Sequence, residues 1–99
     1  MARFDVHAYP SGDGYLLDVQ ADLLDHLNTR VVVPLLAKAT APKPASRLNP
    51  VFEIEGAPFV MVAQFLAAVP KGELGSKLTS LEADFAEITR ALDMVFQGF

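Results

Sequence analysis

Cysteine and tryptophan are absent from the 99-residue sequence. Without cysteine the chain can form neither a disulfide framework nor a thiolate zinc site, although this absence leaves the cellular compartment open. Long apolar runs are lacking too: the longest, residues 57–69, is interrupted by Pro58 and Gln64. A membrane-spanning helix needs roughly 20 apolar residues. The first residues also lack the apolar core of a signal peptide. We therefore expect a cytoplasmic protein that makes no membrane contact.

Basic residues are scarce, with 8 Lys and Arg against 12 Asp and Glu and a formal net charge of -4. This charge argues against a basic patch for nucleic acid or anionic membranes, and it suits a basic partner better. Hydrophobic residues make up 52% of the chain, which excludes a disordered polypeptide. The length fits one domain, residues 1–99. The surplus of apolar residues suggests a second buried surface, most simply a homodimer interface.

Motifs for cofactor or metal chemistry are also missing. The sequence has no glycine-rich phosphate loop, no nucleophile elbow and no metal-ligand spacing, so we expect no cofactor and no metal site. One cluster combines an acid/base group, a hydroxyl and a cation: His26, with Asp25 before it and Thr29 and Arg30 after it. It could cleave RNA if His26 or Asp25 took the 2′-hydroxyl proton while Arg30 stabilised the phosphorane. Alternatively, Asp25 and Arg30 form an ion pair across a turn. His7 is expected to be a solvated strand residue.

Apolar and polar residues alternate, or β-branched residues cluster, in five segments that we predict to be strands. These segments are residues 3–9, 15–20, 30–36, 51–55 and 59–63. The first two should form an antiparallel hairpin across the turn-forming residues 10–14. The run Val31-Val32-Val33 favours burial on both faces, and Pro34, which lacks an N–H donor, should lie at an edge or a bulge.

The remaining segments between strands are expected to be irregular. Residues 21–29 are predicted to form a loop that carries three leucines, with Leu23 and Leu24 as candidates for exposure. Residues 36–50 hold three prolines and three basic residues, which is typical of a surface loop. Residues 65–69 fit either a helical turn or an extension of the preceding strand.

A helix is predicted from Thr79, because Thr79 and Glu82 are spaced as a capping box. Its apolar stripe recurs every three or four residues. The stripe consists of Leu81, Phe85, Ile88, Leu92 and Val95. Gly98 should end the helix. Two roles are open for the residues around it: Phe99 plugs the core, or Phe96 and Phe99 are exposed to a partner, as clustered surface aromatics often are. Five strands and this helix predict an antiparallel α+β, mostly β, domain with a barrel-like or open sheet.

Five further segments share their order and spacing with one known family. They are Asp18-Val19-Gln20-Ala21-Asp22, Arg30 through Leu35, Leu48-Asn49-Pro50-Val51 with Ile54 after it, Val69-Pro70, and Met94-Val95-Phe96-Gln97-Gly98-Phe99. Together they resemble the CcdB toxin family of bacterial toxin–antitoxin modules, over nearly the whole chain.

The resemblance implies a cytosolic homodimer with a small SH3-like antiparallel sheet or barrel and a C-terminal helix. It implies a protein that is not an enzyme but binds the A subunit of DNA gyrase and traps its complex with cleaved DNA. A cognate antitoxin would wrap the toxin with a disordered C-terminal segment, and the pair would repress its operon through the antitoxin's DNA-binding domain. Plasmid maintenance is the cellular role that the resemblance implies. The gyrase-contacting positions of the family fall on Leu23, Leu24, Asp93, Phe96, Gln97, Gly98 and Phe99.

The sequence departs from the family pattern at two of these positions. Gln97 stands where typical gyrase poisons carry Trp, which removes an aromatic face worth about 0.5–2 kcal/mol for stacking an arginine. Asp93 stands where Asn is frequent. Two alternatives therefore accompany the gyrase hypothesis. One is an endoribonuclease toxin on a related small barrel that uses His26, Asp25 and Arg30. The other is a degenerate homologue that only binds its antitoxin.

Overall fold

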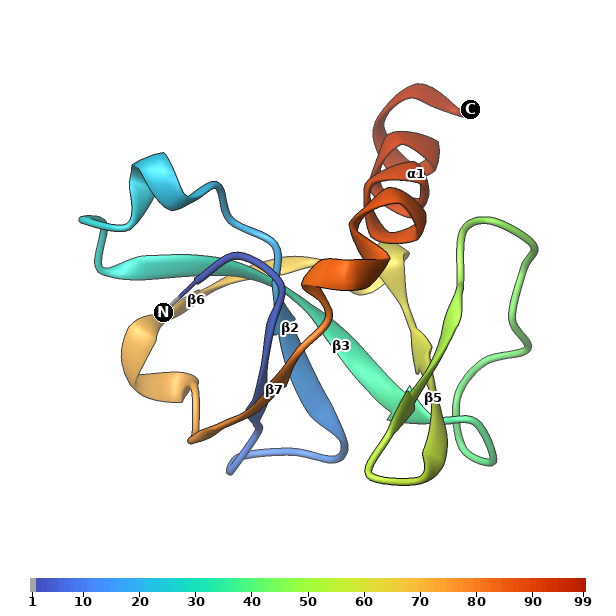
Figure 1. Cartoon of the computed structure of the whole chain (residues 1–99), viewed down its shortest axis with the longest axis horizontal. Coiled ribbons are helices and arrows are strands. Elements are labelled where there is room, and N and C mark those ends of the chain that lie inside the picture. The colour runs from blue at the N-terminus through green and yellow to red at the C-terminus, as the bar shows by residue number, and fades with distance from the viewer. Residues whose placement is uncertain (1) are drawn as a thin grey trace.

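Strand β3 (Thr29–Ala37) is the longest strand, and the sheet is built around it. The computed structural model describes residues 2–99. β2 (Tyr15–Asp18) lies antiparallel on one side of β3, and on the other side β3 pairs first with β6 (Ala67–Pro70) and then with β5 (Ala57–Met61). β4 (Val51–Ile54) continues the sheet beyond β5. β1 (Asp5–Ala8) and β7 (Lys77–Ser80) continue it beyond β2 (Figure 1).

The fold confirms the predicted class, a mostly β, antiparallel α+β domain. One helix, α1 (Phe85–Gln97), packs against the curled sheet. The strand number was too low: seven strands form where five were predicted. The ambiguous segment, residues 65–69, forms neither predicted structure over its whole length. Phe65 ends the short turn η2 (Ala63–Phe65), and residues 67–69 lie in β6, a separate strand that pairs with β3 and does not extend β5. Three other short 3-10 turns are η1 (Asp22–Leu24), η3 (Lys71–Glu73) and η4 (Glu82–Asp84). The predicted surface loop is confirmed between β3 and β4.

The start of the helix is a second correction. Thr79 lies in β7, where it pairs with Val6, so the predicted capping box does not form. Instead, the backbone N–H of Glu82 donates to the Ser80 hydroxyl at 3.2 Å, and α1 begins at Phe85. The exposed edge of β1 thus gains a backbone partner, and strand pairing overrides the local helix signal.

The apolar core lies between one face of the sheet and α1. From the strands it includes Val6, Leu17, Val33, Leu35 and Ile54, and from the C-terminal region it includes Leu81, Ile88 and Ala91. Leu92 and Val95 pack partly buried against it, as predicted. Phe85 was predicted to be part of the buried stripe, but its side chain is 59% exposed. Phe85 is the first residue of α1, and the first helix residue that is buried is Ile88, one turn later.

The opposite face of β1–β3 is buried as well, which confirms the expectation from the valine run. It carries a mixture of apolar and polar side chains: Asp5, His7, Leu16, Asp18, Gln20, Arg30 and Val32. His7, which was predicted to be solvated, is only 4% exposed, and its Nδ1 lies 3.1 Å from the carbonyl oxygen of Gly75. Gly75 belongs to the segment before β7, which therefore contributes to the surroundings of the buried His7 ring.

Pro34 lies inside the central strand and not at an edge. It pairs with Leu16 of β2, and on its other side its carbonyl accepts the N–H of Val62 at 3.0 Å. This position falls between the residues of β3 that pair with β6 and those that pair with β5, where the missing N–H of proline interrupts neither ladder. Gly14, with φ +76°, leads into β2 so close to the Leu35 carbonyl that no Cβ fits there. Among residues 2–99, no helix has the length and apolar character needed to cross a membrane.

Candidate protein-binding surface

The C-terminal tail, defined as residues 94–99, ends α1 with two exposed aromatic rings. Phe96 is 70% exposed and Phe99 is 73% exposed, so the expectation that Phe99 plugs the core is wrong for the folded chain. Gly98 ends the helix as predicted: its φ is +81°, and its N–H donates to the Met94 carbonyl at 3.0 Å. The left-handed conformation, which glycine adopts without strain, turns Phe99 away from the helix axis.

Two polar positions accompany these rings. Gln97 is exposed at the last position of α1, and Asp93 is half-buried one turn earlier. The tail therefore presents the two Phe side chains and one amide, and the Asp93 carboxylate lies directly before it. Leu92 and Val95, on the inner side of the helix, hold this segment against the core.

The second group of predicted site residues lies in the leucine loop, defined here as residues 21–28. Leu23 is 88% exposed, Leu24 is 42% exposed and Leu27 is 38% exposed, so the predicted exposure of Leu23 and Leu24 is confirmed. The turn η1 places Leu23 at its apex, and none of its three residues is buried. An apolar side chain exposed to this degree favours a binding role over a packing role.

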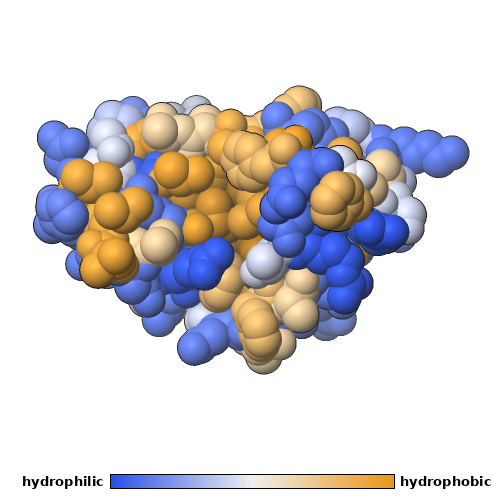
Figure 2. Space-filling view, turned by 90° about the horizontal axis from the view of Figure 1, so that it is seen from above, coloured by the Kyte–Doolittle hydropathy of each residue, from blue (hydrophilic) through white to orange (hydrophobic). Residues whose placement is uncertain are grey.

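The structure places the tail and the leucine loop on the same side of the molecule. In Figure 1 both project upward from the sheet, the loop at the left and α1 at the right. Figure 2 views this side and shows hydrophobic surface over both, with further apolar surface between them. Six of the seven predicted contact residues thus lie in the leucine loop or the tail, and Asp93 directly precedes the tail. Within residues 2–99, no hydrogen bond or ion pair joins the two groups.

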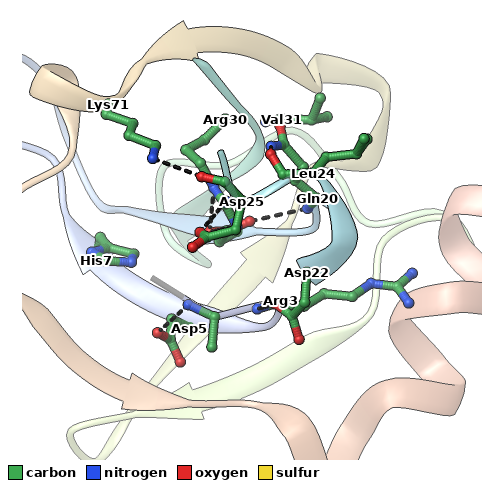
Figure 3. A network of polar contacts seen from close by, with 12 residues as sticks. Arg3, Asp5, His7, Gln20, Asp22, Leu24, Asp25, Arg30, Val31 and Lys71 are labelled. Atoms are coloured by element: carbon green, nitrogen blue, oxygen red, sulfur yellow. Dashed lines mark hydrogen bonds and ion pairs between the residues drawn. The ribbon is translucent and has the colours of Figure 1, made fainter. Parts of the chain in front are cut away.

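The cluster at Asp25 and Arg30 forms a structural network (Figure 3). Arg30 is fully buried: its Nη2 and Nε lie 2.6 Å and 2.9 Å from Asp18 Oδ2, and its Nη1 lies 2.9 Å from Asp25 Oδ1. The ion pair between Asp25 and Arg30 confirms the structural alternative. His26 is exposed next to this network. A guanidinium with no exposed surface and two carboxylate partners cannot contact a phosphate without breaking the network.

Asp18 is the buried anion of this network. Removal from water raises the pKa of its carboxyl, while the backbone N–H of Gln20, at 3.0 Å, and the Arg30 guanidinium oppose that shift. No local sequence pattern indicates this pair, because a residue at the end of β2 meets a residue near the start of β3. The resemblance to the family did mark both segments.

Sequence reasoning also missed three exposed apolar side chains outside the two groups. Phe85 and Phe65 are 59% and 52% exposed, and Val51, in the sheet-edge strand β4, is 41% exposed. Phe65 fell in the ambiguous segment, and Val51 lies opposite the inward-facing Phe52 in the predicted alternation. Residues 2–99 contain no detected pocket and no group of three or more side chains suited to hold a metal ion.

Comparisons with known proteins agree with this fold. An endoribonuclease from a mycobacterial species, solved in complex with its cognate antitoxin, has a TM-score of 0.75 at 20% identity and covers 97% of this chain and 94% of its own. The Mycobacterium tuberculosis toxin MazF-mt6 has a TM-score of 0.76 at 16% identity, over 93% of this chain and 95% of its own. Identities this low show a shared fold. The family model for the CcdB protein matches residues 3–98, which is nearly the whole chain, and the chain therefore belongs to the CcdB family.

Proposed function

We propose that the protein is the toxin of a toxin–antitoxin module and that it acts by binding the A subunit of DNA gyrase, trapping the enzyme on cleaved DNA. It acts as a poison and catalyses no reaction of its own. The contact residues are Leu23 and Leu24 of the leucine loop together with Asp93, Phe96, Gln97, Gly98 and Phe99 of the C-terminal region. Membership of the CcdB family supports the proposal.

The observation that carries this proposal is the exposure of Phe96 and Phe99, at 70% and 73%, at the end of an otherwise well-packed helix. Exposing two large aromatic rings to water costs the chain the hydrophobic free energy that their burial would provide. A partner that covers them recovers it, and aromatic side chains dominate the energetics of such interfaces. The exposed Leu23 on the same side of the molecule extends the surface.

An endoribonuclease activity at Asp25, His26 and Arg30 is the weaker hypothesis. The structural neighbours include endoribonucleases, but at identities of 15–21% the likeness extends to the fold alone. In this chain Arg30, the cation that the hypothesis requires, is fully buried between Asp18 and Asp25.

Calorimetry of the purified protein with the breakage–reunion core of its host's gyrase A subunit tests the proposal. We expect the wild-type protein to bind and Phe96→Ala and Phe99→Ala each to weaken binding about tenfold or more, as for hot-spot aromatics. Phe85→Ala is the matched control, because it removes a ring of the same size, 59% exposed, from the other end of α1. Absence of wild-type binding, or equal losses for all three variants, would overturn the proposal.

The partners beyond gyrase follow from the same proposal. A cognate antitoxin neutralises the toxin with a disordered segment, and the protein reaches DNA only indirectly, through that antitoxin. A structural neighbour was solved with its own cognate antitoxin, which supports this part. We further propose a homodimer in the cytoplasm, in which the two tails are paired across the dimer axis. Expression without the antitoxin should halt growth, and Phe96→Ala or Phe99→Ala should relieve the arrest.

A further inference from the structure

The leucine loop has no apolar anchor of its own. All of residues 21–28 are exposed, and their leucines contribute nothing to the core cluster. A segment of this kind is normally mobile, because nothing compensates for the entropy lost on ordering it. Polar contacts instead connect this loop to the rest of the molecule.

The first contacts come from the buried face of the sheet. The Gln20 side chain bridges loop and strand: its Nε2 donates to the Leu24 carbonyl at 3.0 Å, and its Oε1 accepts the N–H of Val31 at 3.0 Å. Arg30 reaches the loop through its Nη1, which lies 2.9 Å from Asp25 Oδ1. Both residues are buried, at 5% and 0% exposure, so these donors are themselves immobile.

Further contacts hold the outer side of the loop (Figure 3). Lys71 Nζ donates to the Asp25 carbonyl at 2.8 Å, and the Lys71 N–H donates to the Asn28 carbonyl at 3.0 Å. The Arg3 N–H donates to Asp22 Oδ1 at 2.8 Å. The most exposed apolar residue of the chain, Leu23, therefore lies between anchored neighbours.

The Asp25 carboxylate is not needed to neutralise the buried Arg30. Asp18 already lies within 2.6 Å of that guanidinium and is equally buried, whereas the Asp25 side chain is 55% exposed. Arg30 keeps Asp18 as a partner when Asp25 is removed. The Asp25 ion pair therefore matters chiefly for the loop, because it connects the exposed residue 25 to the buried guanidinium of Arg30.

We propose that Gln20, Asp25 and Lys71, anchored by Arg30, are positioning residues that hold Leu23 and Leu24 in their projecting conformation before the partner arrives. This inference rests on the proposed function, in which those leucines contact gyrase. A loop that is already ordered loses little entropy on binding, so more of the free energy of the apolar contacts contributes to the binding affinity.

The test compares Asp25→Ala with Lys77→Ala as the matched control. The control also removes one half-exposed ion pair, between Lys77 of β7 and Asp5 of β1 at 3.3 Å. Within residues 2–99, neither residue has a hydrogen bond or ion pair to the loop. For Asp25→Ala we expect faster hydrogen exchange at the N–H groups of Leu24, Asp25 and Leu27, which bond within the loop. We also expect about tenfold weaker gyrase binding. Lys77→Ala should change neither, and Asp25→Asn, which keeps an acceptor for Arg30, should restore part of both.

A double-mutant cycle separates positioning from direct contact. If Asp25 acts through the leucines, Asp25→Ala should cause no further loss of affinity in a Leu23→Ala, Leu24→Ala background. A full additional loss there, or unchanged loop exchange in Asp25→Ala, would overturn the inference. If the double leucine variant binds gyrase as tightly as the wild-type protein, the proposed function fails at this loop. The exchange measurement on the free protein still decides whether the loop is held by Asp25.

Discussion

Gln97 is the residue at which this chain departs most clearly from a typical gyrase poison, and the structure gives its amide full access to a partner. An indole at this position could stack on an arginine of the target, a contact worth about 0.5–2 kcal/mol. We therefore expect Gln97→Trp to tighten gyrase binding by about twofold to thirtyfold per contact in the calorimetric assay.

The control for this prediction is Glu87→Trp, which adds an indole to an exposed position in the first turn of α1. It should leave the affinity unchanged. Equal gains for both variants would mean that any added aromatic surface tightens binding, and no gain for Gln97→Trp would mean that the target offers no arginine at that position.

Helix α1 connects the tail to the core through one side chain in particular. Ile88 is fully buried against the sheet, so Ile88→Ala leaves a cavity. We expect it to lower the free energy of unfolding by about 2–5 kcal/mol in urea titrations. Phe85→Ala, on the same helix but exposed, should change it by about 0.5 kcal/mol or less. A small effect of Ile88→Ala would show that α1 is held mainly by other contacts.

The elements that could be predicted from sequence were those with a strong local pattern. The alternation in Phe52 and Ile54 and the stop at Gly98 were sufficient to predict a strand and a helix end. β7 could not be predicted, because Thr79 and Ser80 favour a helix start locally and form a strand only when β1 is beside them. β6 pairs with the early part of β3 across about forty residues of sequence, a contact that periodicity does not report.

The residues of the candidate surface and its neighbourhood also fall into two classes, those that a local sequence pattern predicts and those that it does not. Phe96, Phe99 and Leu23 could be predicted because apolar residues in a terminal segment or a polar loop stand out locally. The buried pair of Asp18 and Arg30 could not be predicted from pattern, because it depends on how two strands are aligned. The same dependence on strand alignment left two roles open for Arg30, a catalytic cluster and an ion pair with Asp25, and the structure shows the ion pair.

Exposed apolar side chains are spread over the whole molecule. Among residues 2–99, eight large hydrophobic side chains are 38% or more exposed: Leu23, Leu24, Leu27, Val51, Phe65, Phe85, Phe96 and Phe99. We expect sedimentation equilibrium to give twice the 10.7 kDa chain mass. The melting temperature should rise with protein concentration, because association stabilises the folded state by mass action. A constant melting temperature and the mass of a single chain would contradict the dimer.

The buried ion pair between β2 and β3 also selects one alignment of these strands. Asp18 lies opposite Val32, and Arg30 lies two residues before Val32 on the same face. The run of three valines would fit its neighbours about equally well if β3 slid by one residue. That slip would move Asp18 and Arg30 to opposite faces of the sheet and leave two buried charges without partners, at a cost of several kcal/mol. The pair thus favours the native alignment of this strongly hydrophobic strand over a one-residue slip.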